Sequence, residues 1–307
     1  MKITVCCTDN KAEPWCQGLA AALPGADVSE WRPGAPQADY AVVWKPPQQL
    51  CDEQPGLKAM FNIGAGVDAL IGLRLPPQAL VVRLDDAGMS VQMAEYVCQA
   101  VIRHFREFDA YEADMRAGRW QFRRPRLRGD FPVGVFGMGV LGTRVATALA
   151  QFEFPVNGWS RTPKQRIAGV TGYSGAAQLH GFLAASRVLV NLLPLTPETQ
   201  DILNRDTLAR LQPGCYVVNV ARGAHLVEQD LLDLIASGHV AGATLDVFRT
   251  EPLPADHPFW HHPAITLTPH TSARTLRDES VAQIAGKIRL LEQGGAISGI
   301  VDPVRGY

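Results

Sequence analysis

The sequence predicts an α/β protein of two domains, each built on a mainly parallel sheet. Two observations lead to this prediction. The chain has 307 residues, about twice the size of an ordinary domain, and short apolar runs alternate with helix-length amphipathic segments along almost all of it. Hydrophobic residues make up 47% of the chain and charged residues 19%, a globular composition that excludes a disordered chain.

Composition also limits the kinds of partner and compartment. Lys and Arg number 29 and Asp and Glu 30, so the net charge is −1 and no basic field is available to bind nucleic acid or an anionic membrane. No apolar run approaches the roughly 18 residues that a membrane span requires. The six cysteines form no CxxC pair, so we expect free thiols. With a short apolar N-terminus that reads as a strand, this favours a cytoplasmic protein.

Two series of short apolar runs are predicted to be strands, separated by Gly- and Pro-rich breaks or by helical segments. The first series comprises residues 3–7, 40–44, 58–63 and 80–84. The second comprises residues 133–136, 155–159, 187–192, 215–220, 242–247 and 265–268. Strands that alternate with helices are typical of βαβ units.

Two long helices are predicted at the borders of the second series. Apolar residues recur at helical spacing from Met93, and this helix is expected to run to about Gly118, before a basic loop over residues 119–130. The other helix is expected over residues 276–291. If these helices bracket the second series, it forms a domain that is inserted into the first. We therefore assign residues 98–272 to the inserted domain and residues 1–97 with 273–307 to the other.

A glycine motif lies where the predicted strand 133–136 meets the following helix. Its residues are Gly137, Met138, Gly139, Val140, Leu141 and Gly142. Gly137 permits a tight turn, Gly139 lets the backbone approach a pyrophosphate, and Gly142 lets helix and strand pack closely. The helix N-terminus adds N–H donors and partial positive charge. This context predicts a dinucleotide site in a Rossmann-type domain, whereas a chance match among 28 glycines would be a turn without a ligand.

The turn about 20 residues beyond the motif selects the nucleotide. An acidic residue there would accept a hydrogen bond from the ribose 2′-hydroxyl of NAD, but this sequence has Ser160, Arg161 and Lys164. A hydroxyl, a guanidinium and an ammonium suit a 2′-phosphate, so the turn predicts NADP as cofactor, with NADPH preferred over NADH. The alternative is a solvated basic turn with no role in nucleotide binding.

Further motifs follow predicted strands of the inserted domain. They are Asn191-Leu192-Leu193-Pro194-Leu195-Thr196-Pro197-Glu198-Thr199, Asn219-Val220-Ala221-Arg222-Gly223, Leu245-Asp246-Val247-Phe248-Arg249-Thr250-Glu251-Pro252-Leu253 and Leu267-Thr268-Pro269-His270-Thr271-Ser272. With the glycine motif, Val43-Trp44-Lys45-Pro46-Pro47 and Gly64-Ala65-Gly66-Val67-Asp68, they resemble the D-2-hydroxyacid dehydrogenases over essentially the whole chain. The turn at residues 159–162 and the ending Asp302-Pro303-Val304-Arg305-Gly306-Tyr307 are most similar to the glyoxylate/hydroxypyruvate reductase A branch of that family.

The resemblance implies a Rossmann-like NAD(P)-binding domain inserted into a flavodoxin-like substrate-binding domain. It also implies NADPH-dependent reduction of small 2-keto acids, such as glyoxylate and hydroxypyruvate. Such a reaction adds a hydride to C2 and a proton to the resulting alkoxide, and histidine is suited to deliver that proton near neutral pH. His270 is expected to be the acid, with Glu251 on its other ring nitrogen to fix the tautomer. Arg222 is expected to grip the substrate carboxylate and keto oxygen.

The resemblance further implies contacts with both ligands and with a second copy of the chain. Cofactor contacts are expected from the glycine motif and from Ser160, Arg161, Lys164, Leu193, Pro194, Thr199, Val220, Ala221 and Asp246. Substrate contacts are expected from Trp44, Ala65, Gly66, Val67 and Arg222. A homodimer is expected through the nucleotide domain and the region of residues 93–118, and Trp120 is a candidate to reach an active site across it.

Other interpretations stay open. A dehydrogenase of a larger 2-hydroxy acid, or a nucleotide-sensing binding protein on the same fold, would carry the same motifs. Arg222, Glu251 and His270 each have a structural alternative when taken alone: a surface ion pair, a turn and a structural histidine. His257, His261 and His262 form a small cluster, but no Cys or carboxylate set accompanies it, so we expect a loop and no metal site.

Overall fold

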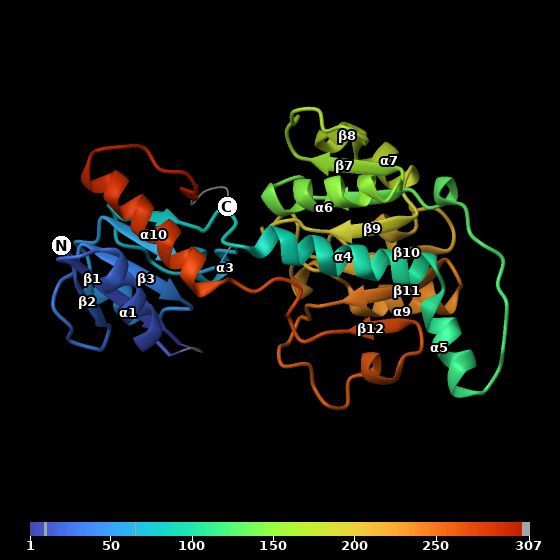
Figure 1. Cartoon of the computed structure of the whole chain (residues 1–307), viewed down its shortest axis with the longest axis horizontal. Coiled ribbons are helices and arrows are strands. Elements are labelled where there is room, and N and C mark those ends of the chain that lie inside the picture. Colours follow the sequence, from blue (N-terminus) through green and yellow to red (C-terminus); the bar gives the residue numbers. More distant parts are fainter. Residues whose placement is uncertain (9–10, 65, 303–307) are drawn as a thin grey trace. The chain divides into compact units, whose positions relative to one another are not determined.

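The computed structural model describes residues 1–8, 11–64 and 66–302. The chain forms two compact units: unit 1 consists of Met1–Met89 and Thr275–Tyr307, and unit 2 of Ser90–Arg274. Each unit has one parallel sheet with helices on its faces (Figure 1), which confirms the predicted fold class. The units divide the chain close to the predicted domain borders, and the assignment of domains to ligands stays a prediction. No helix among the described residues is long and apolar enough to cross a membrane.

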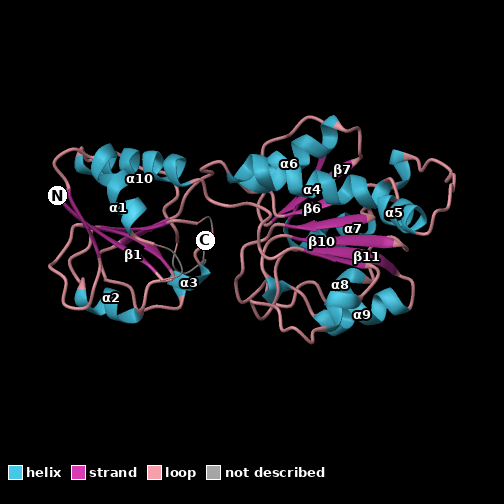
Figure 2. Ribbon diagram, turned by 60° about the horizontal axis from the view of Figure 1, so that its bottom comes forward, coloured by secondary structure: helices cyan, strands magenta, loops and turns pink. Residues whose placement is uncertain are grey.

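Unit 1 contains a five-stranded sheet in the order β2-β1-β3-β4-β5. Its elements are β1 (Lys2–Cys7), α1 (Glu13–Ala22), β2 (Asp27–Glu30), β3 (Tyr40–Trp44), α2 (Gln48–Glu53), β4 (Ala59–Asn62), α3 (Asp68–Ile71), β5 (Leu80–Val82) and α10 (Arg277–Glu292). Helices α1 and α10 pack together on one face of the sheet, and α2 and α3 lie on the other (Figure 2). The last described residues also join this sheet, because the Val301 N–H donates to the Val81 carbonyl at 2.8 Å.

Unit 2 contains a seven-stranded parallel sheet in the order β12-β11-β10-β9-β6-β7-β8. Its strands are β6 (Val133–Phe136), β7 (Val156–Ser160), β8 (Val170–Ser174), β9 (Val188–Asn191), β10 (Cys215–Asn219), β11 (Val240–Leu245) and β12 (Ile265–Leu267). The chain runs from β6 out to β7 and β8, then returns to β9 on the other side of β6. The strand order therefore reverses between β6 and β9, and sheets of this kind bind ligands at the carboxyl ends of the strands beside such a reversal.

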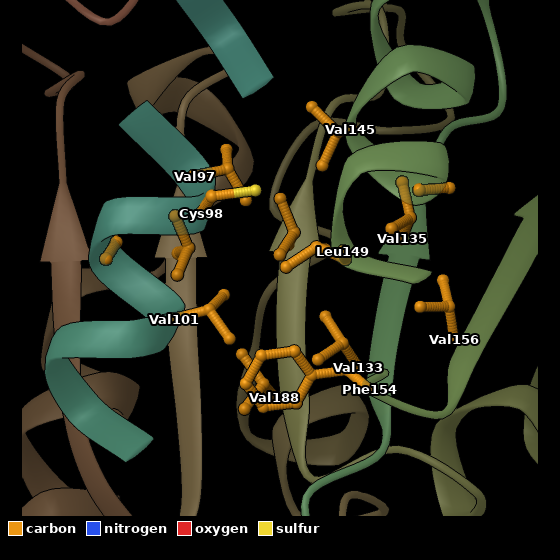
Figure 3. Close-up of a cluster of buried hydrophobic side chains, with 14 of the residues drawn as sticks. Val97, Cys98, Val101, Val133, Val135, Val145, Leu149, Phe154, Val156 and Val188 are labelled. Carbon is orange, nitrogen blue, oxygen red and sulfur yellow. The ribbon is translucent and has the colours of Figure 1, made fainter. Parts of the chain in front are cut away.

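The helices of unit 2 cover both faces of its sheet. They are α4 (Met89–Phe105), α5 (Phe108–Arg116), α6 (Val140–Gln151), α7 (Gly175–Ala184), α8 (Arg205–Leu208) and α9 (Glu228–Ala236), with short 3-10 turns η1 (Arg128–Asp130), η2 (Gly223–His225) and η3 (Pro258–His261). On one face, Val97 and Val101 of α4 and Leu149 of α6 pack against Val133 of β6 (Figure 3). Strands β6 and β9 are buried along their whole length, which explains why both carry no charged residue and why Asn191, at the end of β9, is the one polar residue among their eight.

The helix predicted from Met93 to about Gly118 is two helices, so that prediction is wrong. Helix α4 ends at Phe105 and α5 begins at Phe108. Between them Glu107 has a φ of 57°, in the left-handed region, and a right-handed helix cannot continue through that conformation. Phe108 continues the apolar spacing of α4 across the break, although it is exposed in α5, and so the period alone does not show the break.

Strands β2 and β8 carry no apolar run and therefore escape prediction from the sequence. Each lies at an edge of its sheet, and none of its residues is buried. Backbone pairing with a single neighbour is enough to form such a strand, so its side chains need not be hydrophobic.

Candidate active site

The glycine motif lies between β6 and α6, beside the reversal of the strand order. Gly137 has a φ of 115°, and a Cβ on it would lie 2.7 Å from the Leu192 carbonyl oxygen, so the loop touches the segment after β9. A Cβ on Gly142 would overlap the Gly137 carbonyl oxygen. A Cβ on Gly139 would meet no described atom within 4 Å, so the backbone at this helix N-terminus is open. An open backbone at a helix N-terminus is what a pyrophosphate requires.

The other residues of the motif face different surroundings. The Met138 side chain is buried against Gly158, where a Cβ would lie 2.7 Å from its sulfur, so only its backbone remains for a ligand. Val140 is exposed and Leu141 is half-buried. The nucleotide contact expected of this segment is therefore a backbone contact, made mainly at Gly139.

The turn after β7 presents two basic side chains. Ser160 is buried, and its hydroxyl donates to the Thr162 carbonyl at 2.8 Å, so Ser160 shapes the turn. Arg161 and Lys164 are exposed, and Ser160 and Lys164 also line a pocket of about 200 Å³. Hydrogen bonds from the Thr196 hydroxyl and the backbone lower the pKa of Glu198, and the Arg161 charge adds to this effect. The basic turn therefore lies near the loop after β9.

Side chains of the loops after β9 and β10 form hydrogen bonds with the backbone of the same loops. The Thr199 hydroxyl donates to the Pro194 carbonyl at 2.7 Å and accepts from the Thr196 N–H at 2.8 Å. Leu193 is buried and Pro194 is exposed on this loop. Val220 and Ala221, which follow β10, are also buried. Because the side chains of Leu193, Val220 and Ala221 are buried, the cofactor contacts predicted for these residues would be made by the backbone of the loops.

His270, Glu251 and Arg222 follow β12, β11 and β10. Nδ1 of His270 lies 2.8 Å from Oε2 of Glu251, and Oε1 of Glu251 accepts from the Phe248 N–H at 2.9 Å. Burial alone would raise the pKa of Glu251, but these hydrogen bonds and the charges of His270 and Arg222 outweigh it and lower the pKa. The carboxylate is therefore ionised and Nδ1 of His270 carries a proton. With side chains 46% and 36% exposed, His270 and Glu251 are open to a ligand.

Arg222 belongs to the same group because its charge acts on Glu251. Its guanidinium donates to the Ala221 carbonyl at 2.7 Å, and its own carbonyl accepts from Asn219 Nδ2 at 3.1 Å. A Cβ on the next residue, Gly223, would overlap the backbone of Phe248. The Arg222 loop therefore packs directly on the segment that leads to Glu251.

Asp246 holds the loop that carries His270. Its buried carboxylate accepts from the Thr268 hydroxyl at 2.5 Å and from the N–H groups of Thr271 and Ser272 at 2.8 Å each. Its backbone carbonyl accepts from the His270 N–H at 2.8 Å. These bonds hold His270 at a φ of 53°, a conformation that is unfavourable for a residue with a side chain. The predicted cofactor contact of Asp246 stays a prediction.

In unit 1, Trp44 ends β3 and Asn62 ends the neighbouring strand β4. A Cβ on Gly64 would lie 2.5 Å from the Trp44 ring, so the ring lies against the Gly64 backbone. Buried Asn62 donates from Nδ2 to the carbonyls of Gly64 at 3.0 Å and Gly66 at 2.7 Å. Asn62 therefore stabilises the conformation of this turn, although it belongs to none of the motifs identified in the sequence.

The backbone N–H groups of this turn remain for a ligand. Those of Gly64, Gly66 and Val67 donate to no other residue that the structure describes. A run of N–H groups in a turn suits a carboxylate. Ala65, also expected to bind substrate, lies outside the described residues.

The remaining candidates, Trp120 and the histidine cluster, are not among the residues in the contacts described above. Trp120 is fully exposed. His257 Nε2 lies 3.2 Å from Glu228 Oε2. Within residues 1–8, 11–64 and 66–302, no group of His, Cys, Asp and Glu side chains is arranged to hold a metal ion.

The chain is similar in sequence to known proteins. Residues 98–272 match the model of the D-isomer specific 2-hydroxyacid dehydrogenase family, NAD binding domain. The chain is also 46% identical over 304 residues to glyoxylate/hydroxypyruvate reductase A of Yersinia enterocolitica, with 97% of each chain covered. This chain belongs to the D-isomer specific 2-hydroxyacid dehydrogenase family. The resemblance inferred from the motifs is thereby confirmed.

Solved structures of the same family have a similar fold. A D-isomer specific 2-hydroxyacid dehydrogenase from Xanthobacter autotrophicus, in complex with NADPH and MES, has a TM-score of 0.94 and 41% identity, with 100% of this chain and 99% of that chain covered. An NADPH-dependent glyoxylate/hydroxypyruvate reductase from Sinorhizobium meliloti, in complex with NADP and sulfate, has a TM-score of 0.93 and 36% identity, with coverages of 100% and 99%.

Several residues shape the site in roles that are not predicted from the sequence. They are Asn62, Asn191, Asn219, His225 and Thr268. Four of them, all but Thr268, are buried polar residues, and three of these end otherwise apolar strands. A polar side chain at the carboxyl end of a buried strand is the signal that points to such residues.

Proposed function

We propose that this member of the family is an NADPH-dependent reductase that converts small 2-keto acids, glyoxylate and hydroxypyruvate, to 2-hydroxy acids. The observation that carries the proposal is the 2.8 Å contact of His270 with Glu251 beside the charge of Arg222. It combines a proton donor and a carboxylate-binding cation in one site. The names of the relatives from Yersinia enterocolitica and Sinorhizobium meliloti support the substrate class and the cofactor.

The described residues fit the cofactor. The open backbone at Gly139 would hold the pyrophosphate at the N-terminus of α6. Arg161 and Lys164 would hold the 2′-phosphate, which lies far from the reacting carbon. When bound, NADPH supplies the hydride that is added to C2 of the keto acid.

The proton comes from the chain itself. Because Nδ1 of His270 is held by Glu251, Nε2 is the nitrogen that would donate its proton to the oxygen at C2 as the carbonyl becomes a hydroxyl. Arg222 would hold the substrate carboxylate with charge-assisted hydrogen bonds. In unit 1, the N–H groups of Gly66 and Val67 would offer donors to a carboxylate, and the Trp44 ring lies against this turn.

A homodimer forms part of the proposal. Large apolar side chains are exposed on α5 and on the chain that follows it: Met115 by 70%, Trp120 by 102%, Phe122 by 81% and Leu127 by 69%. Apolar groups that gather on one exposed segment mark an interaction surface, and a second copy is the occupant we propose. For the compartment we propose the cytoplasm, because the six cysteines are free thiols, which a reducing environment preserves.

A substrate panel tests the proposed reaction. We expect the purified chain to oxidise NADPH with glyoxylate and hydroxypyruvate at higher kcat/KM than with phenylpyruvate, measured by the absorbance of the reduced nicotinamide. A preference for phenylpyruvate would support a dehydrogenase of larger acids. Binding of NADPH without turnover of any keto acid would support a nucleotide-sensing protein.

The basic turn makes cofactor choice testable. Hydrogen bonds to charged groups contribute roughly 1.5–3 kcal/mol each, so Arg161→Ala should weaken NADPH binding about ten- to a hundredfold while NADH binding hardly changes. Arg210→Ala is a suitable control, because exposed Arg210 bonds the Asp206 carbonyl of α8 outside the turn. Equal kcat/KM of the wild type with NADH and NADPH would contradict the assignment.

A further inference from the structure

A buried polar cluster joins the loops that follow β9 and β10. It consists of Asn191 at the end of β9, Asn219 at the end of β10 and His225 in η2, and each is 0% exposed. Polar groups at such depth are stable only when they are paired. Their partners are backbone groups of the segments to which the cofactor and substrate contacts are assigned.

Backbone groups determine how both amides are oriented. Asn219 Oδ1 accepts from the Ala221 N–H at 3.3 Å, and Asn219 Nδ2 donates to the Arg222 carbonyl at 3.1 Å. Asn191 Oδ1 accepts from the Leu193 N–H at 3.3 Å. Asn191 Nδ2 is therefore the donor to Asn219 Oδ1 at 3.0 Å, and it faces His225 Nδ1 at 2.9 Å.

These orientations determine the tautomer of His225. Because Asn191 Nδ2 brings a hydrogen to Nδ1 of His225, that nitrogen must accept and carries no proton. The proton is therefore on Nε2, which lies 3.2 Å from the Pro194 carbonyl and donates to it. The same carbonyl accepts from the Thr199 hydroxyl at 2.7 Å.

We infer that His225 is a positioning residue that couples the Arg222 loop to the Leu193–Pro194 loop through its neutral Nε2–H tautomer. The inference rests on the proposed function, in which Arg222 grips the substrate and the Leu193–Pro194 loop borders the cofactor. Through Asn191 and Asn219 the ring supports the backbone of Arg222, and through Nε2 it supports Pro194. One imidazole therefore sets the position of one loop against the other.

The two halves of this linkage can be removed separately. His225→Asn keeps an acceptor near the Nδ1 position and loses the bond to Pro194, whereas His225→Gln reaches the Nε2 position and loses the acceptor for Asn191. We expect His225→Asn to raise the NADPH KM about three- to tenfold with little change in the glyoxylate KM, the cost of one hydrogen bond. His225→Gln should raise the glyoxylate KM with little change in the NADPH KM, and His225→Phe should raise both KM values.

A matched control uses a histidine of the same unit outside the loops. His239 Nε2 lies 3.1 Å from the Leu208 carbonyl. His239→Gln should leave both KM values unchanged. A merely structural role of His225 would lower the thermal midpoint in all three variants without separating the two KM values.

The tautomer is tested without any enzymatic assay. In long-range ¹H–¹⁵N spectra of the wild type, labelled with ¹⁵N-histidine, the ring signals that vanish in His225→Gln should be those of a neutral Nε2–H imidazole. Assignment of the His225 ring to the Nδ1–H form, or to the doubly protonated form, would overturn the inference.

The two proposals fail in different ways. Absence of wild-type turnover with glyoxylate and hydroxypyruvate would be a failure of the proposed function. The NADPH dissociation constants of His225→Asn and His225→Gln, measured by fluorescence titration, would then still test the link to Pro194. A wild type that turns over, with both variants shifting the two KM values equally or not at all, would overturn the inference about His225 alone.

Discussion

At the scale of single residues, the site depends on how His270 is held. Its backbone is in the left-handed region, and bonds from the neighbouring Asp246 and from Glu251 keep it there and orient its ring. Residues in sparsely populated conformations persist where their surroundings determine them, and they gather at functional sites. The ring nitrogen that Glu251 does not bind is left to act on a ligand.

Removal of the imidazole should abolish proton delivery. General acid catalysis contributes about 10²- to 10⁴-fold, so His270→Ala should lower kcat by that factor while the NADPH dissociation constant stays nearly unchanged. The His257–Glu228 pair, at 3.2 Å, offers a matched control in the same unit, and His257→Ala should retain kcat. A normal kcat in His270→Ala would remove His270 from the mechanism.

A second histidine makes the stability of unit 2 depend on pH. His104 of α4 stacks on Tyr216 with ring centres 4.1 Å apart. Burial, with smaller effects of the Arg126 and Arg187 charges, lowers the pKa of His104 to about 4. The unfolded chain protonates a histidine near pH 6.5, so stability is fully present above that pH and is lost as the pH falls toward about 4.

The pH effect should disappear with the imidazole. The linked loss at about pH 5 is up to about 2 kcal/mol, and His104→Phe, which keeps a stacked ring, should lack this loss. The free energy of unfolding in urea, compared at neutral pH and near pH 5, measures it. The same pH dependence in both proteins would show that His104 is protonated in the folded state.

At the scale of elements, the reversal of strand order between β6 and β9 positions the nucleotide site. It brings the glycine loop against Leu192, where a Cβ on Gly137 would lie 2.7 Å from the carbonyl oxygen. The glycines of the loop are required for different physical reasons. Gly142 has no room for a Cβ within the fold, whereas Gly139 has open space around it.

Two glycine variants should separate folding from binding. Gly142→Ala places a Cβ on the Gly137 carbonyl and should lower the free energy of unfolding by about 1–3 kcal/mol. Gly139, with a φ of −78°, tolerates alanine, so Gly139→Ala should change stability by less than about 1 kcal/mol. Its methyl group should nevertheless weaken NADPH binding about tenfold or more, by occupying the phosphate position. Unchanged NADPH affinity in Gly139→Ala would place the pyrophosphate elsewhere.

At the scale of the whole molecule, unit 1 is closed by contacts between distant parts of the chain. Glu292 of α10 accepts from the Tyr40 hydroxyl at 2.7 Å and pairs with Lys58 at 3.0 Å. Buried Lys287 pairs with Asp85 at 3.0 Å. The segment after the inserted unit therefore completes the sheet domain with which the chain begins.

The exposed apolar segment after α5 should control assembly. We expect the wild type to sediment as a dimer and the double variant Trp120→Glu, Phe122→Glu to sediment as a monomer, because a buried charge opposes an apolar interface. Leu290→Glu is the control, since Leu290 is a 46% exposed apolar residue of α10, outside this segment. A wild type that sediments as a monomer would contradict the homodimer.

The sequence by itself determined the parallel α/β class, the glycine motif and the identities of Arg222, Glu251 and His270. The class and the glycine motif are encoded by local period and spacing, since buried parallel strands must be apolar and nucleotide turns must contain glycine, whereas Arg222, Glu251 and His270 are implied by the resemblance to the family. Only the tertiary structure decided the break at Glu107, the edge strands β2 and β8, and the supporting contacts of Asn62, Asp246 and His225. A left-handed residue, an edge pairing or a buried hydrogen bond depends on the folded conformation of the backbone around it, and no local pattern of residue types records it.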